Sequence, residues 1–448
     1  MSVVLGLAAG WLLDHLAFIN RSGYELRGPC AGLGSPFAPG TPAGHGPAAS
    51  AAERDGSGSV AAARAAASPA RFVFREEFFS IARPYLAAAL PERPGRGCPQ
   101  RCLTDAAAVC SPQKRKRKCV FNQGELDALE YHEKVRTLIS EGTSLLVQEG
   151  LRTGFLHHAA AEAGCRRSAV PGHAGCELAE LCGMAKQFPA ESHRRAVQVL
   201  SEETSIPEQD LLSCVTENSS NCAQIVVLMG QKYLVPPKSS FLLSDISCLQ
   251  PLLDYKRNYG VIVIDPPWEN KSVKRSNRYS YLASWKIKQI PVPALAAPDC
   301  LVVTWVTNRQ KHLRFVKDEL YPHWCVKTLA EWHWVKITTA GEFVLPLDSS
   351  HKKPYEVLVL GRVQGLLKEA LREPEEAPPI PEHKLLVSVP CSLHSHKPPL
   401  AAVLAEFVKP DVECLELFAR NLQPGWTSWG NEVLKFQHID YFTLRHSD

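Results

Sequence analysis

Residues 259–270 read YGVIVIDPPWEN, and this stretch predicts both the fold of the chain and the place of its chemistry. Four consecutive apolar residues, 261–264, are typical of a strand that is buried on both faces of a parallel sheet. The strand is expected to end at Pro266 and Pro267, which supply no backbone N–H to a ladder. Residues 265–268 should therefore lie just past the carboxyl end of a central strand, where ligands bind in open α/β sheets.

The residue types in this stretch suit the alkylation of an exocyclic amine on a nucleobase. Such an amine is a poor nucleophile because its lone pair is delocalised into the ring, so an enzyme must accept its hydrogens. Asp265 offers one acceptor, and the Pro266 carbonyl offers a second, because Pro267 has no N–H with which to pair it. Trp268 offers a flat face for stacking. The competing interpretation is a capped strand end with a core tryptophan, since a motif match alone is only a hypothesis.

Length, charge and cysteine usage limit the possible classes of protein. A chain of 448 residues allows two or three domains, and a net charge of +4 does not by itself indicate a nucleic-acid-binding protein. The odd count of 15 cysteines, with no C-x-x-C pair and no secretory segment, predicts a reducing compartment and no metal site. No apolar run is long enough to span a bilayer, so we expect no membrane association.

The first quarter of the chain predicts little packed structure. Residues 1–27 are expected to form an N-terminal amphipathic helix over 2–16, with a mitochondrial presequence as the weaker alternative. Residues 28–121 are rich in Ala, Gly, Pro and Ser and are expected to be largely disordered, apart from a short ordered island at 72–79.

The basic run 114–118 reads KRKRK and has three interpretations. It is a nuclear import signal, a nucleic-acid tether or a solvated charge run. Import is favoured, so we expect the protein in the nucleus and also in the cytoplasm, with the mitochondrial matrix as the alternative.

Two regions with different hydrophobic patterns follow the basic run. Residues 122–236 are expected to form a helical region, with helix-like apolar spacing over 126–146 and further helices at 176–187, 193–203 and 206–215. From residue 237 to 448, strand-like runs alternate with helices, which predicts a doubly wound α/β sheet. The expected strands are 261–264, 301–306, 325–335, 357–360, 385–389 and 413–418, and the expected helices are 310–320 and 399–408.

A basic loop follows the central strand and is the first candidate for substrate binding. It combines cationic side chains with polar residues and an aromatic ring and has no acid, so it can contact phosphates and fold over a nucleotide. An ordinary solvated loop is the alternative. The substrate-binding candidates are Lys271, Arg275, Asn277, Arg278 and Tyr279, together with Lys353 further along the chain.

Two further polar sets follow expected strands. Residues 413–421 end a strand with polar side chains, and Asn431 and Glu432 come after the next one, where an amide and a carboxylate can hold ribose hydroxyls. Lys397, in the sequence SHKP, is expected to open a helix and could hold a carboxylate. Each signal alone fits routine capping or surface charge, but three such sets around one sheet are much less expected by chance.

Taken in order, the motifs DPPW (265–268), SHKP (395–398), ELFAR (416–420) and WGNE (429–432) resemble those of the DPPW-type adenine-N6 methyltransferases. The resemblance implies a Rossmann-like methyltransferase fold with a permuted motif order and S-adenosylmethionine as the methyl donor. By the same resemblance, residues 265–268 bind the target amine, Lys397 lies at the reacting centre and Tyr279 belongs to a mobile loop. The implied cofactor-binding residues are Asp245, Ile246, Lys397, Phe418, Arg420, Asn431 and Glu432.

The sequence departs from the family's messenger-RNA enzyme at two places. The segment between Arg420 and Trp426 is shorter, so the histidine of that enzyme has no clear counterpart, and Glu432 stands where that enzyme has a glutamine.

The function that the resemblance implies is N6-methylation of adenosine in RNA, in particular of 2′-O-methyladenosine in a spliceosomal small nuclear RNA. DNA adenine is the rival substrate. A non-catalytic RNA-binding partner is the alternative of a different class, but family members of that kind have lost the DPPW set, which is intact here. The need for a protein partner stays open.

Overall fold

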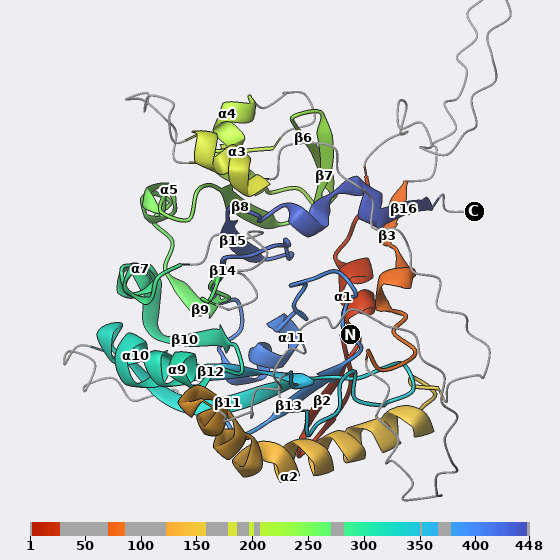
Figure 1. Ribbon diagram of the computed structural model, residues 1–448. Helices are drawn as coiled ribbons and strands as arrows, with labels where there is room; N and C mark the ends of the chain where they lie inside the picture. The colour runs from red at the N-terminus through yellow and green to blue at the C-terminus, as the bar shows by residue number, and fades with distance from the viewer. Residues whose placement is uncertain are drawn as a thin grey trace, which may run out of the picture.

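The computed structural model describes residues 2–26, 70–85, 122–157, 178–185, 197–200, 207–269, 282–349, 352–365 and 378–445. Within these ranges a twelve-stranded sheet forms the centre of the molecule (Figure 1), with the strand order β1-β2-β13-β11-β12-β10-β9-β14-β15-β8-β5-β4. The basic run 114–118 and the loop 270–281 lie outside the described residues.

The middle of the sheet is parallel. β9 (Tyr259–Ile264) lies between β10 (Ala296–Val306) and β14 (Cys414–Leu417), and β15 (Trp426–Gly430) and β8 (Ser239–Leu243) follow on the β14 side. The carboxyl ends of these strands therefore meet at one edge of the sheet. Strand order differs from chain order here, so the fold is Rossmann-like, as the resemblance implies.

The other half of the sheet brings three more strands to the same edge. β12 (Tyr355–Val363) is antiparallel to both β10 and β11 (Val326–Lys336), and β13 (Leu385–Ser388) is parallel to β11. The start of β12 thus lies where β10 and β11 end. All six expected strands are confirmed, although β10 and β12 are longer than expected.

Both faces of the sheet are covered, which confirms the doubly wound arrangement. Ile262 and Ile264 of β9 pack with residues of α7 (Ser284–Lys288) and α8 (Val292–Leu295). The alternate residues Val261 and Val263 pack on the opposite face with α11 (Ala401–Leu404). The other covering elements are α5 (Gln250–Asp254), α9 (Gln310–Arg314), the π-helix η2 (Phe315–Leu320), α10 (Tyr321–His323) and the 3₁₀ turn η3 (Ala405–Phe407).

The prediction of an N-terminal helix over residues 2–16 is wrong. The chain begins with a hairpin of β1 (Val3–Leu7) and β2 (Gly10–Leu13), and only α1 (His15–Arg21), capped by Asp14, is helical. β2 joins the sheet beside β13. Gly10 allows this close approach, because a Cβ there would lie 2.0 Å from the Leu385 carbonyl oxygen. Pairing with a distant strand therefore overrides the local apolar spacing.

The prediction of a helical region over 122–236 is only partly correct. α2 (Gln123–Arg152) begins with a capping box of Asn122 and Glu125, and α3 (Leu178–Ala185) is also helical. The expected helices 193–203 and 206–215 instead contain β4 (Val197–Val199), the short α4 (Glu208–Leu211) and the first residue of β5 (Val215–Asn218). Because β5 pairs with β8, the sheet crosses the domain boundary expected at residue 237.

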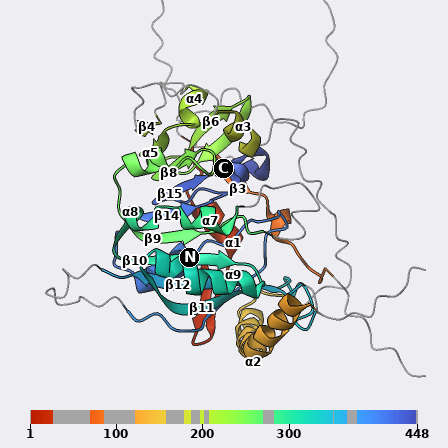
Figure 2. The same ribbon diagram turned by 60° about the vertical axis from the view of Figure 1, so that its left-hand side comes forward.

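The remaining elements lie around the sheet (Figures 1 and 2). The long helix α2 packs Ile139 and Leu146 against residues of β2 and β13. β3 (Arg71–Phe74) pairs with β16 (Phe442–Arg445), and the 3₁₀ turn η1 (Glu76–Phe79) follows it, which confirms the ordered island. β6 (Gln224–Leu228) and β7 (Gln231–Val235) form a hairpin, and the 3₁₀ turns η4 (Lys435–Gln437) and η5 (Ile439–Tyr441) precede β16. None of the described helices is both long and apolar enough to cross a membrane.

Candidate active site

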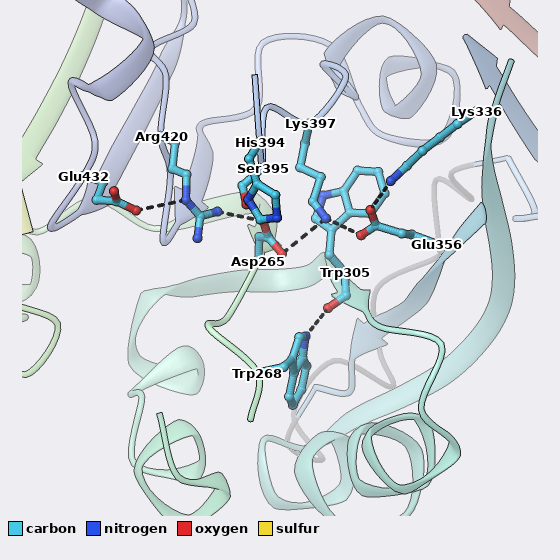
Figure 3. A network of polar contacts seen from close by, with 10 residues as sticks. All are labelled: Asp265, Trp268, Trp305, Lys336, Glu356, His394, Ser395, Lys397, Arg420 and Glu432. Atoms are coloured by element: carbon cyan, nitrogen blue, oxygen red, sulfur yellow. Dashed lines mark hydrogen bonds and ion pairs between the residues drawn. The ribbon is translucent and has the colours of Figure 1, made fainter. Parts of the chain in front are cut away.

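A chain of seven alternating charges runs along the carboxyl edge of the sheet, and we call it the ion-pair chain; Figure 3 shows all of its members except Lys435. Asp265, which follows β9, is its centre: Oδ2 accepts from Nη1 of Arg420 at 3.0 Å, and Oδ1 lies 3.7 Å from Nζ of Lys397. The Asp265 side chain is only 12 % exposed, so these cations act in a partly desolvated site. The ion-pair chain consists, in spatial order, of Lys336, Glu356, Lys397, Asp265, Arg420, Glu432 and Lys435.

The turn after β9 is held by backbone hydrogen bonds. The Asp265 N–H donates to the Leu417 carbonyl of β14, and the Trp268 N–H donates to the Pro266 carbonyl at 2.8 Å. The sequence predicts that the Pro266 carbonyl is freed from sheet pairing, and the bond that it accepts here comes from within the turn. A carbonyl oxygen has two lone pairs, so one remains. The Leu282 N–H donates to the Pro267 carbonyl, so the segment before α7 also fixes this turn.

The prediction that Trp268 offers a stacking face is wrong for this structure. The indole is 5 % exposed and packs on the His312 ring, with ring centroids 4.8 Å apart. Its Nε1–H donates to the Trp305 carbonyl at 2.8 Å (Figure 3). Burial lowers the pKa of His312 to about 4, so its ring is neutral, and its Nε2 contacts the Glu269 carbonyl. Trp268 thus anchors the turn in the core.

Lys397 links Asp265 to the other half of the sheet. Its ammonium pairs with Glu356 as well as Asp265, and it lies 4.8 Å from the centre of the Trp305 ring. Burial acts to lower the pKa of Lys397, but the two carboxylates outweigh it and the pKa is raised. The two carboxylates that Lys397 holds belong to the protein itself, and its expected place at the cofactor stays a prediction. The expectation that it opens a helix is wrong, because α11 begins at Ala401.

Arg420 links Asp265 to the end of β15. Its Nε donates to Glu432 at 3.2 Å, and Glu432 also accepts from Lys435 at 2.6 Å. Phe418, between β14 and Arg420, has φ +60, a left-handed conformation that a bulky residue rarely adopts. Strain of this kind is maintained when the surrounding structure demands it and clusters at functional sites.

Glu416 of β14 is a buried carboxyl group beside the ion-pair chain. It accepts from the side-chain amide of Gln423 at 3.0 Å. Burial raises the pKa of Glu416 to about 7, helped by the negative charge of Asp265, while Gln423 and Arg420 oppose the shift. Sequence reasoning assigned no role to Glu416, although it lies within the ELFAR motif.

This raised pKa predicts a pH-dependent stability. The folded protein keeps the Glu416 proton up to about pH 7, whereas an unfolded glutamate loses it near pH 4.3, so the stabilisation is fully present below pH 4.3 and is lost as the pH rises toward 7. The expected size is on the order of 3 kcal/mol. In urea unfolding at pH 5 and pH 8, the free energy of unfolding of Glu416→Gln should lack this part of the pH dependence. Glu413→Gln, which changes an exposed carboxylate at the other end of β14, should keep the slope. Equal slopes in wild type and Glu416→Gln would contradict the assignment.

The expected cofactor residues near β8 and β15 lie at the same edge. Asp245 follows β8, and its Oδ1 accepts from the Ser247 N–H and hydroxyl at 2.8 Å each. Ile246 packs on the core, and the Asn431 carbonyl after β15 accepts from Cys182. Asp245, Asn431 and Asp265 therefore share the edge where ligands bind in such sheets.

Most of the expected substrate-binding residues are not placed by the structure. Lys271, Arg275, Asn277, Arg278 and Tyr279 lie outside the described residues. Lys353 is described but does not join the ion-pair chain. Its ammonium donates to the Leu347 carbonyl at 3.3 Å.

The structure adds residues that sequence reasoning missed. Lys336 and Glu356 are joined at 2.6 Å and continue the ion-pair chain, and Lys435 ends it. The antiparallel pairing of β12 brings Glu356 to this edge, and no local sequence pattern predicts that pairing. At the end of β10, Thr307 Oγ1 and Asn308 Oδ1 are buried without hydrogen-bond partners, which fits a polar ligand at this place. Within the described ranges, no group of three or more His, Cys, Asp or Glu residues could hold a metal ion.

Known proteins of similar sequence identify the family of this chain. The MT-A70 family profile matches residues 259–432, from the start of β9 to Glu432. The human protein named N(6)-adenine-specific methyltransferase METTL4 is 54 % identical over 99 % of this chain and 98 % of its own length. The chain belongs to the MT-A70 family. Two further relatives are more distant. A Pyricularia oryzae protein named N6-methyladenosine RNA methyltransferase MTA1 is 35 % identical over 52 % of this chain and 62 % of its own length. A Caenorhabditis elegans protein named DNA N6-methyl methyltransferase is 35 % identical over 48 % of this chain and 56 % of its own length.

Proposed function

We propose that the protein is an adenine-N6 methyltransferase that uses S-adenosylmethionine and acts on adenosine in RNA. The observation that carries the proposal is Asp265 at the end of β9, whose side chain lies between Arg420 and Lys397 and is followed by the Pro266 carbonyl at the same turn. Two relatives that are similar over almost their full length are named N(6)-adenine-specific methyltransferases, and these names support the reaction class.

The residues of this chain would act on the amine in two ways. Asp265 accepts a hydrogen bond from one N–H of the amine, and the remaining lone pair of the Pro266 carbonyl accepts a hydrogen bond from the other. The two hydrogen bonds orient the nitrogen and favour a more tetrahedral geometry. The salt bridges fix the carboxylate before the substrate arrives, so no reorganisation is needed at the moment of reaction. The target base must be unpaired or flipped out, because the amine of a paired base is inaccessible.

The edge of the sheet has the donors and acceptors that S-adenosylmethionine requires. When bound, this cofactor supplies a methyl group on a sulfonium centre. The unpartnered oxygens of Thr307 and Asn308 could accept from an amino group, and Asn431 and Glu432 lie where ribose hydroxyls are expected.

The preferred substrate is 2′-O-methyladenosine in a spliceosomal small nuclear RNA, to which the motif resemblance points. DNA adenine is the second candidate, and the relatives' names include both an RNA and a DNA enzyme. A methyl-transfer assay should compare matched RNA and DNA oligonucleotides, with and without a 2′-O-methyl group on the target adenosine. The proposal expects the 2′-O-methylated RNA to be methylated fastest. Faster transfer to DNA would overturn the RNA assignment, and no transfer to any of the four would overturn the reaction.

The basic run 114–118 carries a separate prediction about location. We propose that it directs import into the nucleus, with a smaller cytoplasmic pool. Replacing its five residues with alanine in a tagged full-length protein should shift the signal to the cytoplasm, because import receptors read clustered positive charge. Alanine replacements of Lys232, Lys238 and Lys256, which are dispersed cations, serve as the control. An unchanged nuclear signal in the 114–118 variant would leave the run as a solvated tether.

A further inference from the structure

Trp285 is a large aromatic side chain that the fold leaves uncovered. It lies on α7 and is 58 % exposed, although the same short helix buries Ile287 completely in the core. Lys286 lies beside it, with Nζ 5.5 Å from the centre of the Trp285 ring. Among the described residues no carboxylate pairs with Lys286, whereas Lys288 pairs with Glu319. The surface of α7 therefore offers one flat apolar ring with one uncommitted cation.

The position of α7 relates this surface to the active site. The Leu282 N–H donates to the Pro267 carbonyl at 3.0 Å, so the segment leading into α7 touches the turn that carries Asp265. Trp285 is three residues further along, and three residues span at most about 11 Å between Cα atoms. Stacked nucleotides rise about 3.4 Å each along a strand, so this reach corresponds to roughly three nucleotides.

We propose that Trp285 and Lys286 bind the single-stranded nucleic acid next to the target adenine, with Trp285 stacking on a flanking base and Lys286 contacting a phosphate. The inference rests on the proposed function for the identity of the target base. A ring beside a cation is the combination that binds single strands without reading sequence, since every base has a π-face and every linkage a charge. Trp285 also takes the stacking role that the burial of Trp268 denies to that residue.

A protein partner fits this surface less well. Protein interfaces need a contiguous apolar core, and the exposed residues next to Trp285 are Ser284 and Lys286. Among the described residues, no other exposed large apolar side chain lies on α7 or α8; the others are Leu7, Tyr85, Leu126, Leu145, Met184, Val199, Val227 and Met229.

The test measures oligonucleotide binding separately from catalysis. Fluorescence anisotropy with a labelled single-stranded RNA should show that Trp285→Ala weakens binding by roughly 5- to 150-fold, the loss of one stacked base. Trp285→Phe should retain most of the affinity, and Lys286→Gln should weaken binding less while reducing the salt slope by about one. Leu145→Ala, at an apolar side chain that is 54 % exposed on α2, is the control and should bind normally.

An abasic scan assigns the contact. Replacing flanking nucleotides one at a time by abasic residues should weaken wild-type binding at one position and leave Trp285→Ala unaffected there. Wild-type affinity in Trp285→Ala, or an abasic penalty that is equal in both proteins at every position, would overturn the inference. Failure of the proposed function gives a different result: the wild-type protein would bind RNA in a way that depends on Trp285 but would methylate no adenine. The inference would also be overturned if Trp285→Ala bound RNA normally and lost activity only when a protein partner was present.

Discussion

Asp265→Asn is expected to reduce methyl transfer by on the order of a hundredfold or more while leaving the fold intact. Asparagine keeps the size of the side chain and one acceptor, but it removes the charge that faces Arg420 and Lys397. The amine then meets a weaker acceptor, and the preorganised field around it is lost. Folding should be largely preserved because Arg420 still pairs with Glu432, and Lys397 still pairs with Glu356.

Single-turnover methyl transfer at saturating cofactor and RNA is the appropriate measurement, since it isolates the chemical step from product release. Asp299→Asn is the matched control. Asp299 is also ion-paired, with Arg362 at 3.1 Å, but it is 63 % exposed and lies near the start of β10, away from the carboxyl edge. Its variant should transfer methyl groups at the wild-type rate. A folded Asp265→Asn protein with wild-type activity would show that the active site lies elsewhere.

Trp268→Ala is expected to lower the free energy of unfolding by roughly 3–5 kcal/mol, the usual cost of removing a buried tryptophan. The change opens a cavity against His312 and leaves the Trp305 carbonyl without its donor. Trp268→Phe keeps a ring in the core but still loses the donor, so its expected cost is smaller, about 1–3 kcal/mol. Urea unfolding followed by circular dichroism measures both values.

The chain supplies its own control for this substitution. Trp285→Ala makes the same chemical change at an exposed site and should alter stability by no more than about 0.5 kcal/mol. The two tryptophans should therefore separate: Trp268 governs stability and Trp285 governs nucleic-acid binding. If Trp268→Ala proved as stable as Trp285→Ala and instead lost affinity for RNA, Trp268 would be the stacking surface after all.

Local sequence patterns predict the part of the fold that depends on neighbours in the chain. The apolar run before Asp265 places β9 correctly, because a strand buried on both faces has no polar alternation. The polar residues after β14 and β15 are also predicted to lie at one edge, since parallel strands bring their carboxyl ends together. Arg420 and Lys397 were expected near the cofactor, and the structure brings both to Asp265.

The errors arise where distant pairing decides the structure. The N-terminal residues look helical in isolation, but β2 pairs with β13 near the other end of the chain. Glu356 reaches the ion-pair chain only because β12 runs antiparallel to its neighbours. The side chain of Trp268 turns inward because His312, on a helix after the next strand, provides a surface for it. No periodicity within a single segment contains this information.

The pairing of β2 has a consequence for the order in which the protein acquires its fold during synthesis. Trp11 donates to Glu406, a residue 395 positions later, and β13 is also made late. At 5–20 residues per second, a ribosome needs roughly 20–80 s to pass from one partner to the other. Until β13 is made, β2 lacks the strand that joins it to the sheet, and only α2, which packs on Leu12, is available to cover the hairpin of β1 and β2. β2 is therefore translated long before the strand that completes its pairing, and its unpaired edge needs protection from aggregation in that interval.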